Sequence, residues 1–491
     1  MFIGIDLGTS SLKVIVLDRS HQVRASASVP LRVQQPQPLW REQAPVDWWT
    51  ACQQALQAAL AKAREGGVAA GDIEALGLTG QMHGATVLDA QGGVLRPAIL
   101  WNDGRAHREC ADLEAAVPSA RSITGNLMMP GFTAPKLLWL ARHEPAVFAR
   151  IARVLLPKDY LRWQLTGDYA TDLSDAAGSL WLDVGQRDWS DELLAATSLS
   201  RAHMPRLHEG PEVTGQLRKD VAQRLGLRAI PVVAGASDNA AGALGVGVVS
   251  PGDAMLSLGT SGVYFAATDG YRSNPAQAVH SFCHALPGTW HLMSVMLSAA
   301  ACVDFAARLT GEPDIERLMA LAEARGLNVD TPLFLPYLNG ERTPHNNPAA
   351  QAVLFGMTAA TDRADVANAV LEGVAHGMAQ GMAAVDRTGA VARSISLIGG
   401  GSRSAYWAQL LADVSGKTLL RRADAQVGPA LGAARLAWMA TDRAGAAEVC
   451  RAPALLATHE PDATRHALLA QRHARFNRLY QQVASSFPLP A

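Results

Sequence analysis

The chain has 491 residues, of which 49% are apolar and 18% charged, and its formal net charge is −1. This length exceeds the size at which a single hydrophobic core stops growing, so two large domains are expected. The near-neutral charge excludes the basic field that nucleic acid or an anionic membrane surface would require. Five scattered cysteines without a CxxC pair, no basic leader and no apolar run of roughly 20 residues predict a soluble, cytoplasmic protein without a disulfide framework or a membrane span.

Strand-like runs open the chain. FIGID and KVIVL flank the turn LGTSS, and VRASASV follows them, which predicts a β-meander. Apolar residues recur at helical spacing over residues 46–65, and IEALGLTG at 73–80 predicts a buried strand after this helix. A long helical tract is expected over about 105–165. The first half therefore mixes strands and helices, as an α/β protein does.

The second half repeats this opening. A buried strand ending in small residues, IPVVAGASDNAAGALGVG near residue 230, is followed by PGDAMLSLGTSGVYFAAT, again a strand, an LGTS turn and a strand. SISLIGGGSRSAYW at 394–407 predicts a strand followed by a glycine turn, and PDATRHALLAQRHARFNRLYQQV predicts a terminal amphipathic helix. The chain is therefore expected to be internally duplicated, with a cleft between two closely packed domains, and such clefts commonly bind ligands.

The repeated LGTS turn is a candidate phosphate site. Gly8 and Gly259 are expected to permit tight turns with positive φ, and successive backbone N–H groups there can form an anion-binding concavity. A plain hairpin is the alternative for one isolated copy, but two copies opening two similar halves favour phosphate binding. SGKT at residues 415–418 is not expected to be a P-loop, because Leu411 stands where the first glycine is required and a helix, not a strand, is predicted before the motif.

Two aspartates are candidate functional carboxylates. Asp6 ends an otherwise apolar strand, where a buried carboxylate without a partner would be costly, so a cation is expected nearby. Mg²⁺ prefers oxygen ligands and is typically held by one or two carboxylates plus phosphates. Asp238, in GASDN, is the second candidate, with helix N-capping as its alternative role.

Several segments together resemble the FGGY carbohydrate kinases over essentially the whole chain. They are GIDLGTSSLK, GQMHGATVLDA, LWNDGR, ITGNLMMPGFTAPKLLWLARH, LLPKDYLRWQLTG, GASDNAAGALGVG, MLSLGTSGVYF, FLPYLNGERTPHNNP, AVLFGMTAATDRADVANAVLE and LIGGGSRSAYW. Within the family, the match is closest to bacterial members that phosphorylate D-xylulose. The resemblance implies an actin-like ATPase fold, with ribonuclease H-like domains repeated twice around a central cleft. We expect residues 1–240 to carry the sugar site and the first phosphate loop, and 241–491 to carry the second phosphate loop, the adenosine site and the terminal helix.

The resemblance also implies roles for individual residues. Asp238 matches the catalytic base that takes a proton from the sugar hydroxyl, and Asp6 matches a magnesium-holding carboxylate with Asp238 as its partner. The matching nucleotide residues are Thr9, Ser10 and Lys13 in the first phosphate loop, Thr260 in the second, and Gly400 and Ser404 beside the adenosine. One departure is Ala236–Ser237, where the family usually has more glycine before the base.

For the sugar, Met82 and His83 stand where the family places its substrate-selective pair, although a lone histidine is more often a core residue. Further expected sugar contacts are Trp101, Asn102 and Asp103 in LWNDGR, and Asn239 beside the base. The alternative for LWNDGR is that the tryptophan packs in the interior and that Asp103 or Arg105 forms a structural ion pair. The segment GERTPHNN at 340–347 marks the family, but its chemistry is not readable from the sequence.

The resemblance implies transfer of the γ-phosphoryl group of ATP to the 5-hydroxyl of D-xylulose with Mg²⁺, with a homodimer as one possible assembly. A sibling kinase for ribulose, fuculose, gluconate or glycerol is the nearest alternative, and the Met82–His83 pair argues against it. An actin-like or chaperone-type ATPase without a sugar substrate is a further alternative, which Asp238 and LWNDGR disfavour.

Overall fold

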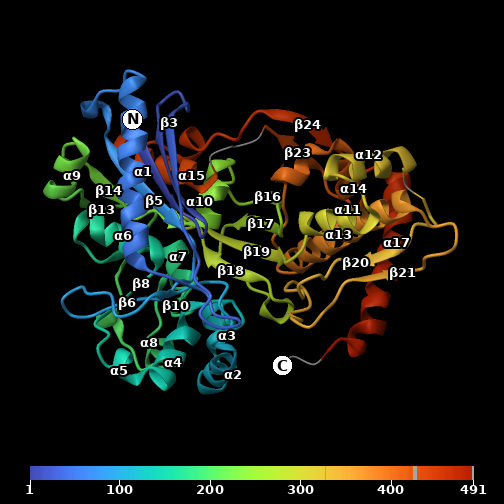
Figure 1. Ribbon diagram of the computed structural model, residues 1–491, viewed down its shortest axis with the longest axis horizontal. Coiled ribbons are helices and arrows are strands. Elements are labelled where there is room, and N and C mark those ends of the chain that lie inside the picture. Colours follow the sequence, from blue (N-terminus) through green and yellow to red (C-terminus); the bar gives the residue numbers. More distant parts are fainter. Residues whose placement is uncertain (327, 424–427, 489–491) are drawn as a thin grey trace.

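A computed structural model describes residues 1–326, 328–423 and 428–488. In these ranges the chain builds two seven-stranded sheets, one on the left of Figure 1 and the other near its centre. The first sheet has the order β13–β14–β5–β1–β2–β3, and β15 also pairs with β5. Its strands are β1 (Phe2–Leu7), β2 (Ser11–Leu17), β3 (Val23–Pro30), β5 (Ala75–Gly80), β13 (Val213–Gln216), β14 (Pro231–Val233) and β15 (Ala236–Ser237).

The second sheet has the order β18–β19–β17–β16–β22–β23–β24. Its strands are β16 (Asp253–Leu258), β17 (Gly262–Thr268), β18 (His280–Cys283), β19 (Trp290–Met296), β22 (Ser394–Ile398), β23 (Leu419–Arg422) and β24 (Leu455–His459). Short two-stranded pairs complete the β-structure: β4 (Glu42–Gln43) with β7 (Ala98–Ile99), β6 (Thr86–Leu88) with β8 (Arg153–Leu155), β9 (Ala170–Asp172) with β12 (Arg206–His208), β10 (Leu182–Asp183) with β11 (Asp188–Trp189), and β20 (Leu333–Leu335) with β21 (Val353–Phe355).

The two sheets repeat one topology. In the first, β1 pairs antiparallel with β2 and parallel with β5. In the second, β16 pairs antiparallel with β17 and parallel with β22. Each sheet thus has an antiparallel meander followed by parallel strands, which confirms the predicted duplication and the two β-meanders around LGTS.

The helices of the first half are α1 (Pro45–Glu65), α2 (His107–Ala116), α3 (Ala120–Thr124), α4 (Thr133–His143), α5 (Pro145–Phe148), α6 (Pro157–Thr166), α7 (Leu173–Ala177), α8 (Asp191–Ala196), α9 (Lys219–Leu225) and α10 (Asp238–Gly245). Those of the second half are α11 (Ala300–Thr310), α12 (Ile315–Arg325), α13 (Arg363–Asp386), α14 (Ala405–Ser415), α15 (Gly428–Asp442), α16 (Ala446–Val449) and α17 (Ala463–Val483). The helices predicted at 46–65 and at the C-terminal end are confirmed as α1 and α17.

The helical tract predicted over about 105–165 is made of separate helices. Five helices, α2 to α6, and the strand β8 occupy it. Proline explains several of the breaks, because it removes a backbone donor and is tolerated only in the first turn of a helix. Pro145 and Pro157 accordingly stand at the starts of α5 and α6.

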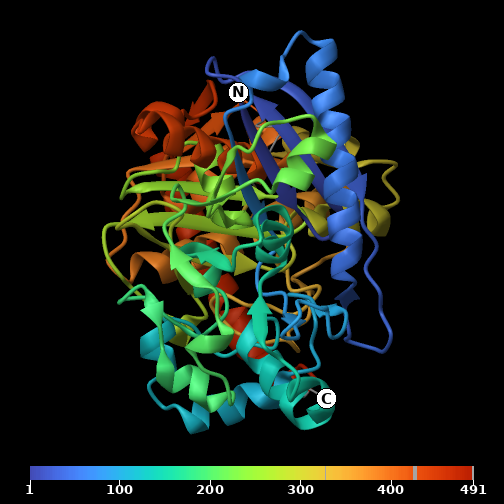
Figure 2. The same cartoon turned by 90° about the vertical axis from the view of Figure 1, so that its left-hand side faces the viewer.

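Helices cover the two faces of the first sheet differently. Along β1, Ile3, Ile5 and Leu7 share a core with α1, which runs beside the blue strands in Figure 2. The alternate residues Phe2 and Gly4 face α15, since successive side chains on a strand point to opposite faces. A side chain on Gly4 would overlap the backbone of α15, so glycine is required for this close approach.

α15 comes from the second half of the chain but packs on β1, β5 and α10 of the first half. The halves therefore interlock, and the division expected at residue 240 stays a prediction. In the described part of the chain, no helix combines the length and the apolar character needed to cross a bilayer. All five cysteines are free and buried.

Candidate active site

The two LGTS turns join the first strands of each sheet, β1 to β2 and β16 to β17. Positive φ was expected at Gly8 and Gly259, and this expectation is wrong: neither glycine lies in the left-handed region. A Cβ on Gly8 would lie 3.0 Å from the carbonyl oxygen of Ser11, and one on Gly259 would lie 3.7 Å from that of Ser261. At Gly8 a side chain would thus crowd the backbone of the turn itself, whereas at Gly259 it would make only an ordinary contact.

Each turn is anchored to its own half. In the first, Thr9 Oγ1 donates to Gln81 Oε1 at 3.2 Å and accepts from Trp101 Nε1 at 2.9 Å. In the second, the carbonyl of Thr260 accepts from the backbone N–H of Ala299 at 2.9 Å, just before α11 begins. The side chains of Ser10 and Thr260 are exposed, so the structure leaves both predicted phosphate contacts accessible.

Asp6 lies opposite Lys13 in the β1–β2 pairing, beside the first turn. Its pKa is raised to about 7, first by burial and then by the nearby Asp238 carboxylate, while Lys13 opposes the shift. Asp6 and Asp238, which are far apart in sequence, therefore lie near enough for their charges to interact. The position of Asp6 in the second sheet is held by Ser257, two residues before Gly259, so the duplicated strand has no matching acid.

Asp238 is the first residue of α10, and Ser237 is its N-cap, accepting from Ala240 N–H at 3.4 Å. The N-cap role considered for Asp238 is therefore wrong. Instead, the backbone and side-chain N–H groups of Asn239 both donate to Asp238 Oδ1, at 2.7 and 2.9 Å. Burial raises the pKa of Asp238 to about 6, and the two hydrogen bonds from Asn239 oppose the shift.

Ala236–Ser237, the departure from the glycine-rich family pattern, has a structural use here. Besides capping α10, Ser237 donates its backbone N–H to Ser174 Oγ at 3.0 Å. This bond ties the turn before Asp238 to the start of α7, so the backbone that carries the base is held on both sides.

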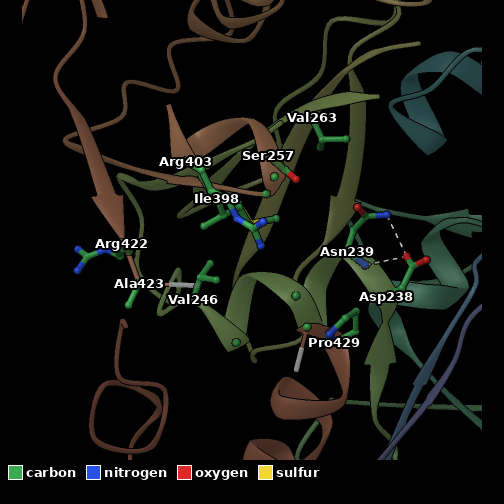
Figure 3. A pocket seen from close by; sticks show the side chains of 16 residues that line it. Asp238, Asn239, Val246, Ser257, Val263, Ile398, Arg403, Arg422, Ala423 and Pro429 are labelled. Atoms are coloured by element: carbon green, nitrogen blue, oxygen red, sulfur yellow. Dashed lines mark hydrogen bonds between the residues drawn. The ribbon is translucent and has the colours of Figure 1, made fainter. Parts of the chain in front are cut away.

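A cavity of about 390 Å³ opens beside Asp238 (Figure 3). Asp238 and Asn239 lie at one side of it, and Arg422 and Ala423 lie at the other. It is lined by parts of α10, β16, β17 and β22 and by the start of α15; the lining residues are Asp238, Asn239, Gly242, Gly245, Val246, Met255, Ser257, Val263, Ile398, Gly399, Gly400, Arg403, Arg422, Ala423, Gly428 and Pro429. The volume is in the range of small-molecule and cofactor sites.

Gly400 lines this cavity as expected for an adenosine contact, and a Cβ there would meet no atom within 4 Å. Ser404 instead caps α14, accepting from Trp407 N–H at 3.2 Å, and it is not among the lining residues. The sequence reasoning missed Arg403 and Arg422. Arg403 stands in the quoted motif GGGSRS, so the motif contained the signal, whereas nothing local marked Arg422.

Met82 and His83 follow β5 and lie near the base: Met82 Sδ is 3.8 Å from Asn239 Nδ2. The His83 ring lies edge-on to Phe132, with ring centroids 4.4 Å apart, and its Nδ1 is 2.6 Å from the carbonyl oxygen of Gly178. Burial lowers the pKa of His83 to about 3, so the ring is neutral. The predicted pair therefore stands next to the candidate base.

The LWNDGR segment divides into two parts. Trp101 and Asn102 are exposed, and Trp101 contacts the first phosphate turn through Thr9. Asp103 is buried and forms an ion pair with Arg105 at 2.7 Å, while also accepting from Arg41 N–H at 2.6 Å. For Asp103 the geometry favours the structural alternative, and a sugar contact remains a prediction.

Residues from the second half of the chain also lie near the predicted sugar pair. Phe282 and His280, both in β18, lie 6.3 and 5.6 Å, centroid to centroid, from the Phe132 ring. His280 Nε2 is 3.2 Å from Arg342 NH1, and its Nδ1 is 3.0 Å from Asn126 Oδ1. Arg342 belongs to the segment GERTPHNN, whose chemistry the sequence did not reveal, and it lies close enough to lower the pKa of His83.

Two copies of one sheet topology, each opening with an LGTS turn, and a carboxylate beside a nucleotide-sized cavity define the actin-like ATPase class of phosphotransferases. The N-terminal domain of the FGGY family of carbohydrate kinases matches residues 1–245, and its C-terminal domain matches residues 254–441. The chain therefore belongs to the FGGY family of carbohydrate kinases.

Close relatives share this architecture. The chain is 56% identical to the xylulose kinase of Escherichia coli K12, over 98% of this chain and 99% of that protein, and 54% identical to the xylulose kinase of Klebsiella pneumoniae, over 98% and 99%. A solved structure described as a xyloylose kinase from Brucella ovis is 44% identical and superimposes with a TM-score of 0.94, covering 99% of both chains. The actin-like fold expected from the sequence is confirmed.

Proposed function

We propose that this protein transfers the γ-phosphoryl group of ATP to the 5-hydroxyl of D-xylulose. The observation that carries the proposal is the position of Asp238, which lines the nucleotide-sized cavity while its neighbour Asn239 contacts Met82 of the predicted sugar pair. A base at this junction can serve a hydroxyl on one side and a phosphate on the other. The identity of the sugar rests on the relatives, which are xylulose kinases.

In the proposed reaction, the oxygen of the sugar hydroxyl forms a bond to the γ-phosphorus while the bond from this phosphorus to the leaving ADP breaks. Asp238 accepts the proton of the hydroxyl. With a pKa of about 6, the carboxylate is ionised near neutral pH and can still act as a base. General bases of this kind typically contribute ~10²–10⁴ in rate, and the remainder comes from positioning and from neutralising the phosphate charge.

Asp6 and Asp238 also fit a magnesium site. They are two neighbouring carboxylates: burial raises the pKa of Asp6, the charge of Asp238 adds to the shift, and a bound divalent cation would relieve this repulsion. Mg²⁺ is typically held by one or two carboxylates together with phosphates and water; in the described residues no cluster of three or more His, Cys, Asp or Glu side chains could hold a metal. Bound Mg²⁺ would supply charge neutralisation to the phosphates of ATP.

The first test is ADP release with Mg·ATP over D-xylulose, ribulose, fuculose, gluconate and glycerol. D-xylulose should have the highest kcat/KM, and the variant Asp238→Asn should lose about 10²-fold or more in kcat. Asp269→Asn is a matched control, because that carboxylate is 70% exposed and forms only a surface ion pair.

Preference for another sugar would identify a sibling kinase. Tight nucleotide binding without turnover of any sugar would point to an actin-like ATPase. Near-normal turnover by Asp238→Asn would remove the general base from the proposal. A cytoplasmic location and a homodimer also remain proposals; sedimentation of the purified protein decides the second.

A further inference from the structure

We propose that Lys136 is a positioning residue for sugar recognition, which holds the backbone of His83 so that its ring presents one hydrogen-bond acceptor to the substrate. The inference rests on the proposed function. It concerns a buried amine in the segment GFTAPK that has no part in the phosphoryl-transfer step described above.

Lys136 lies in the first turns of α4 and is fully buried. Its Nζ donates to the carbonyl oxygen of His83 at 2.9 Å and to that of Gly131 at 2.8 Å. Thr133 Oγ1 donates to the same His83 carbonyl at 3.1 Å. Two side chains from one helix start thus converge on a single backbone oxygen of the predicted sugar pair.

The burial of this amine is costly, which indicates that its hydrogen bonds have a use. Burial lowers the pKa of Lys136 to about 7; Asp103 opposes the shift, and Arg105 adds to it. An apolar side chain of similar length would occupy the same space without desolvating a charge. What the amine adds is a set of N–H donors directed at two carbonyl groups.

His83 needs such support because its φ is +68°, a left-handed conformation that is unfavourable for a residue with a side chain. Conformations of this kind are strained and persist only where surrounding contacts impose them. The bonds from Lys136 and Thr133 to the His83 carbonyl are contacts of this type.

The backbone conformation of His83 also determines which of its ring nitrogens is available to the substrate. A carbonyl can only accept, so the 2.6 Å contact with Gly178 assigns the ring proton to Nδ1. Nε2 is then a lone-pair acceptor, suited to a hydroxyl donor such as a sugar O–H. A Cβ on Gly178 would lie 2.7 Å from His83 Nδ1 and 2.8 Å from Met82 Cε, so only glycine permits this arrangement.

The same amine connects the loops that carry the predicted sugar wall. Gly131, its second acceptor, packs so closely on the backbone of Trp101 that a side chain there would overlap the Trp101 carbonyl. The next residue, Phe132, contributes the ring that lies edge-on to His83. Lys136 therefore links the His83 loop to the loop that supports Trp101.

The test compares Lys136→Met, Thr133→Val and Thr133→Ser with the wild-type enzyme. Lys136→Met should raise KM for D-xylulose ~10-fold, and Thr133→Val should raise it by a smaller factor, because each removes hydrogen bonds to an otherwise buried carbonyl. Thr133→Ser keeps the hydroxyl and should behave as wild type. KM for ATP should stay within about twofold in all variants, since the nucleotide cavity is not touched.

Lys62→Met is the matched control, because Lys62 also donates to a backbone carbonyl, that of Ser26 at 3.1 Å, but does so at the surface. A readout independent of turnover is the ¹⁵N spectrum of His83, which should show Nδ1 protonation in the wild type and a mixture of tautomers in Lys136→Met.

A purely structural role would lower the melting temperature of Lys136→Met and Thr133→Val without changing KM for the sugar or the tautomer, and that result overturns the inference. If Lys136→Met does not fold, Thr133→Val against Thr133→Ser decides in the same way. Failure of the proposed function looks different: the wild-type enzyme would then not turn over D-xylulose.

Discussion

At the scale of single residues, Glu341 shows what the segment GERTPHNN does in the fold. Its Oε1 accepts from the backbone N–H groups of Leu297, at 3.1 Å, and of Arg342, at 2.7 Å. The carboxyl therefore joins the end of β19 to the segment that carries Arg342 toward the sugar side. Burial raises the pKa of Glu341 to about 7, against which these hydrogen bonds and the Arg342 charge act.

This shift predicts a pH dependence of stability. Between about pH 4.5 and 7 the carboxyl holds its proton in the folded protein but loses it in the unfolded chain, so the native state binds more protons. The free energy of unfolding should therefore fall as the pH rises through this window. In Glu341→Gln, whose amide oxygen can still accept both backbone bonds, this contribution should vanish.

Urea unfolding of both proteins at pH 5 and pH 7 measures the effect. The free energy of unfolding of the wild type, relative to that of Glu341→Gln, should be lower at pH 7 than at pH 5. If the difference in the free energy of unfolding between the two proteins is the same at pH 5 and pH 7, Glu341 is ionised in the folded protein at both.

At the scale of elements, the contact of α15 with α10 and the first sheet depends on glycines. A side chain on Gly432 would overlap the backbone carbonyl of Ala241 in α10, and one on Gly77 would overlap that of Ala433 in α15. Helices approach this closely only where side chains are missing. Since Asp238 begins α10, this packing also sets the position of the candidate base.

Gly432→Ala should lower the free energy of unfolding by about 1–3 kcal/mol, the usual cost of overpacking a close-packed contact. Gly242→Ala is the matched control in the partner helix: a Cβ there meets nothing within 4 Å. It should be neutral or stabilising by about 0.5–1 kcal/mol, because alanine is the better helix former. Chemical denaturation of the two variants distinguishes them; equal losses would show that packing against α10 is not the cause.

At the scale of the whole molecule, the two halves meet at α15 and also at β18. Asn126, from the first half, donates to the carbonyl of Ser281 at 2.8 Å and accepts from its N–H at 3.3 Å. The same Oδ1 contacts His280 Nδ1 at 3.0 Å. One buried amide thus docks β18, with His280 and Phe282, against the predicted sugar side.

Asn126→Ala should raise KM for D-xylulose several-fold while leaving KM for ATP unchanged, because it leaves the Ser281 backbone groups unpaired and loosens this contact between the halves. Asn274→Ala is the matched control, since Asn274 donates to the Ala384 carbonyl at 2.9 Å within the second half only. Steady-state kinetics with each substrate varied in turn provides the comparison. If both variants changed sugar KM equally, docking between the halves would not be the reason.

The sequence alone determined the elements and pairings that depend on local pattern. Alternating and apolar runs predicted both meanders, the repeated LGTS predicted the duplication, and apolar surroundings singled out Asp6 and Asp238. These features are readable because hydrophobic periodicity and turn residues act over a few positions. The local reading was wrong at Gly8 and Gly259, whose φ is not positive, and it did not place the breaks between the helices of 105–165.

Only the tertiary structure decided what lies together. It placed α15 of the second half on the first sheet, brought Asp6 close to Asp238, gave the N-cap of α10 to Ser237, and directed Lys136 at the His83 carbonyl. Each of these depends on contacts between residues far apart in the chain, where packing and desolvation outweigh local preference. The repeated turns could be recognised in the sequence, but the base, the cavity and the sugar side became one site only when the two halves closed on each other.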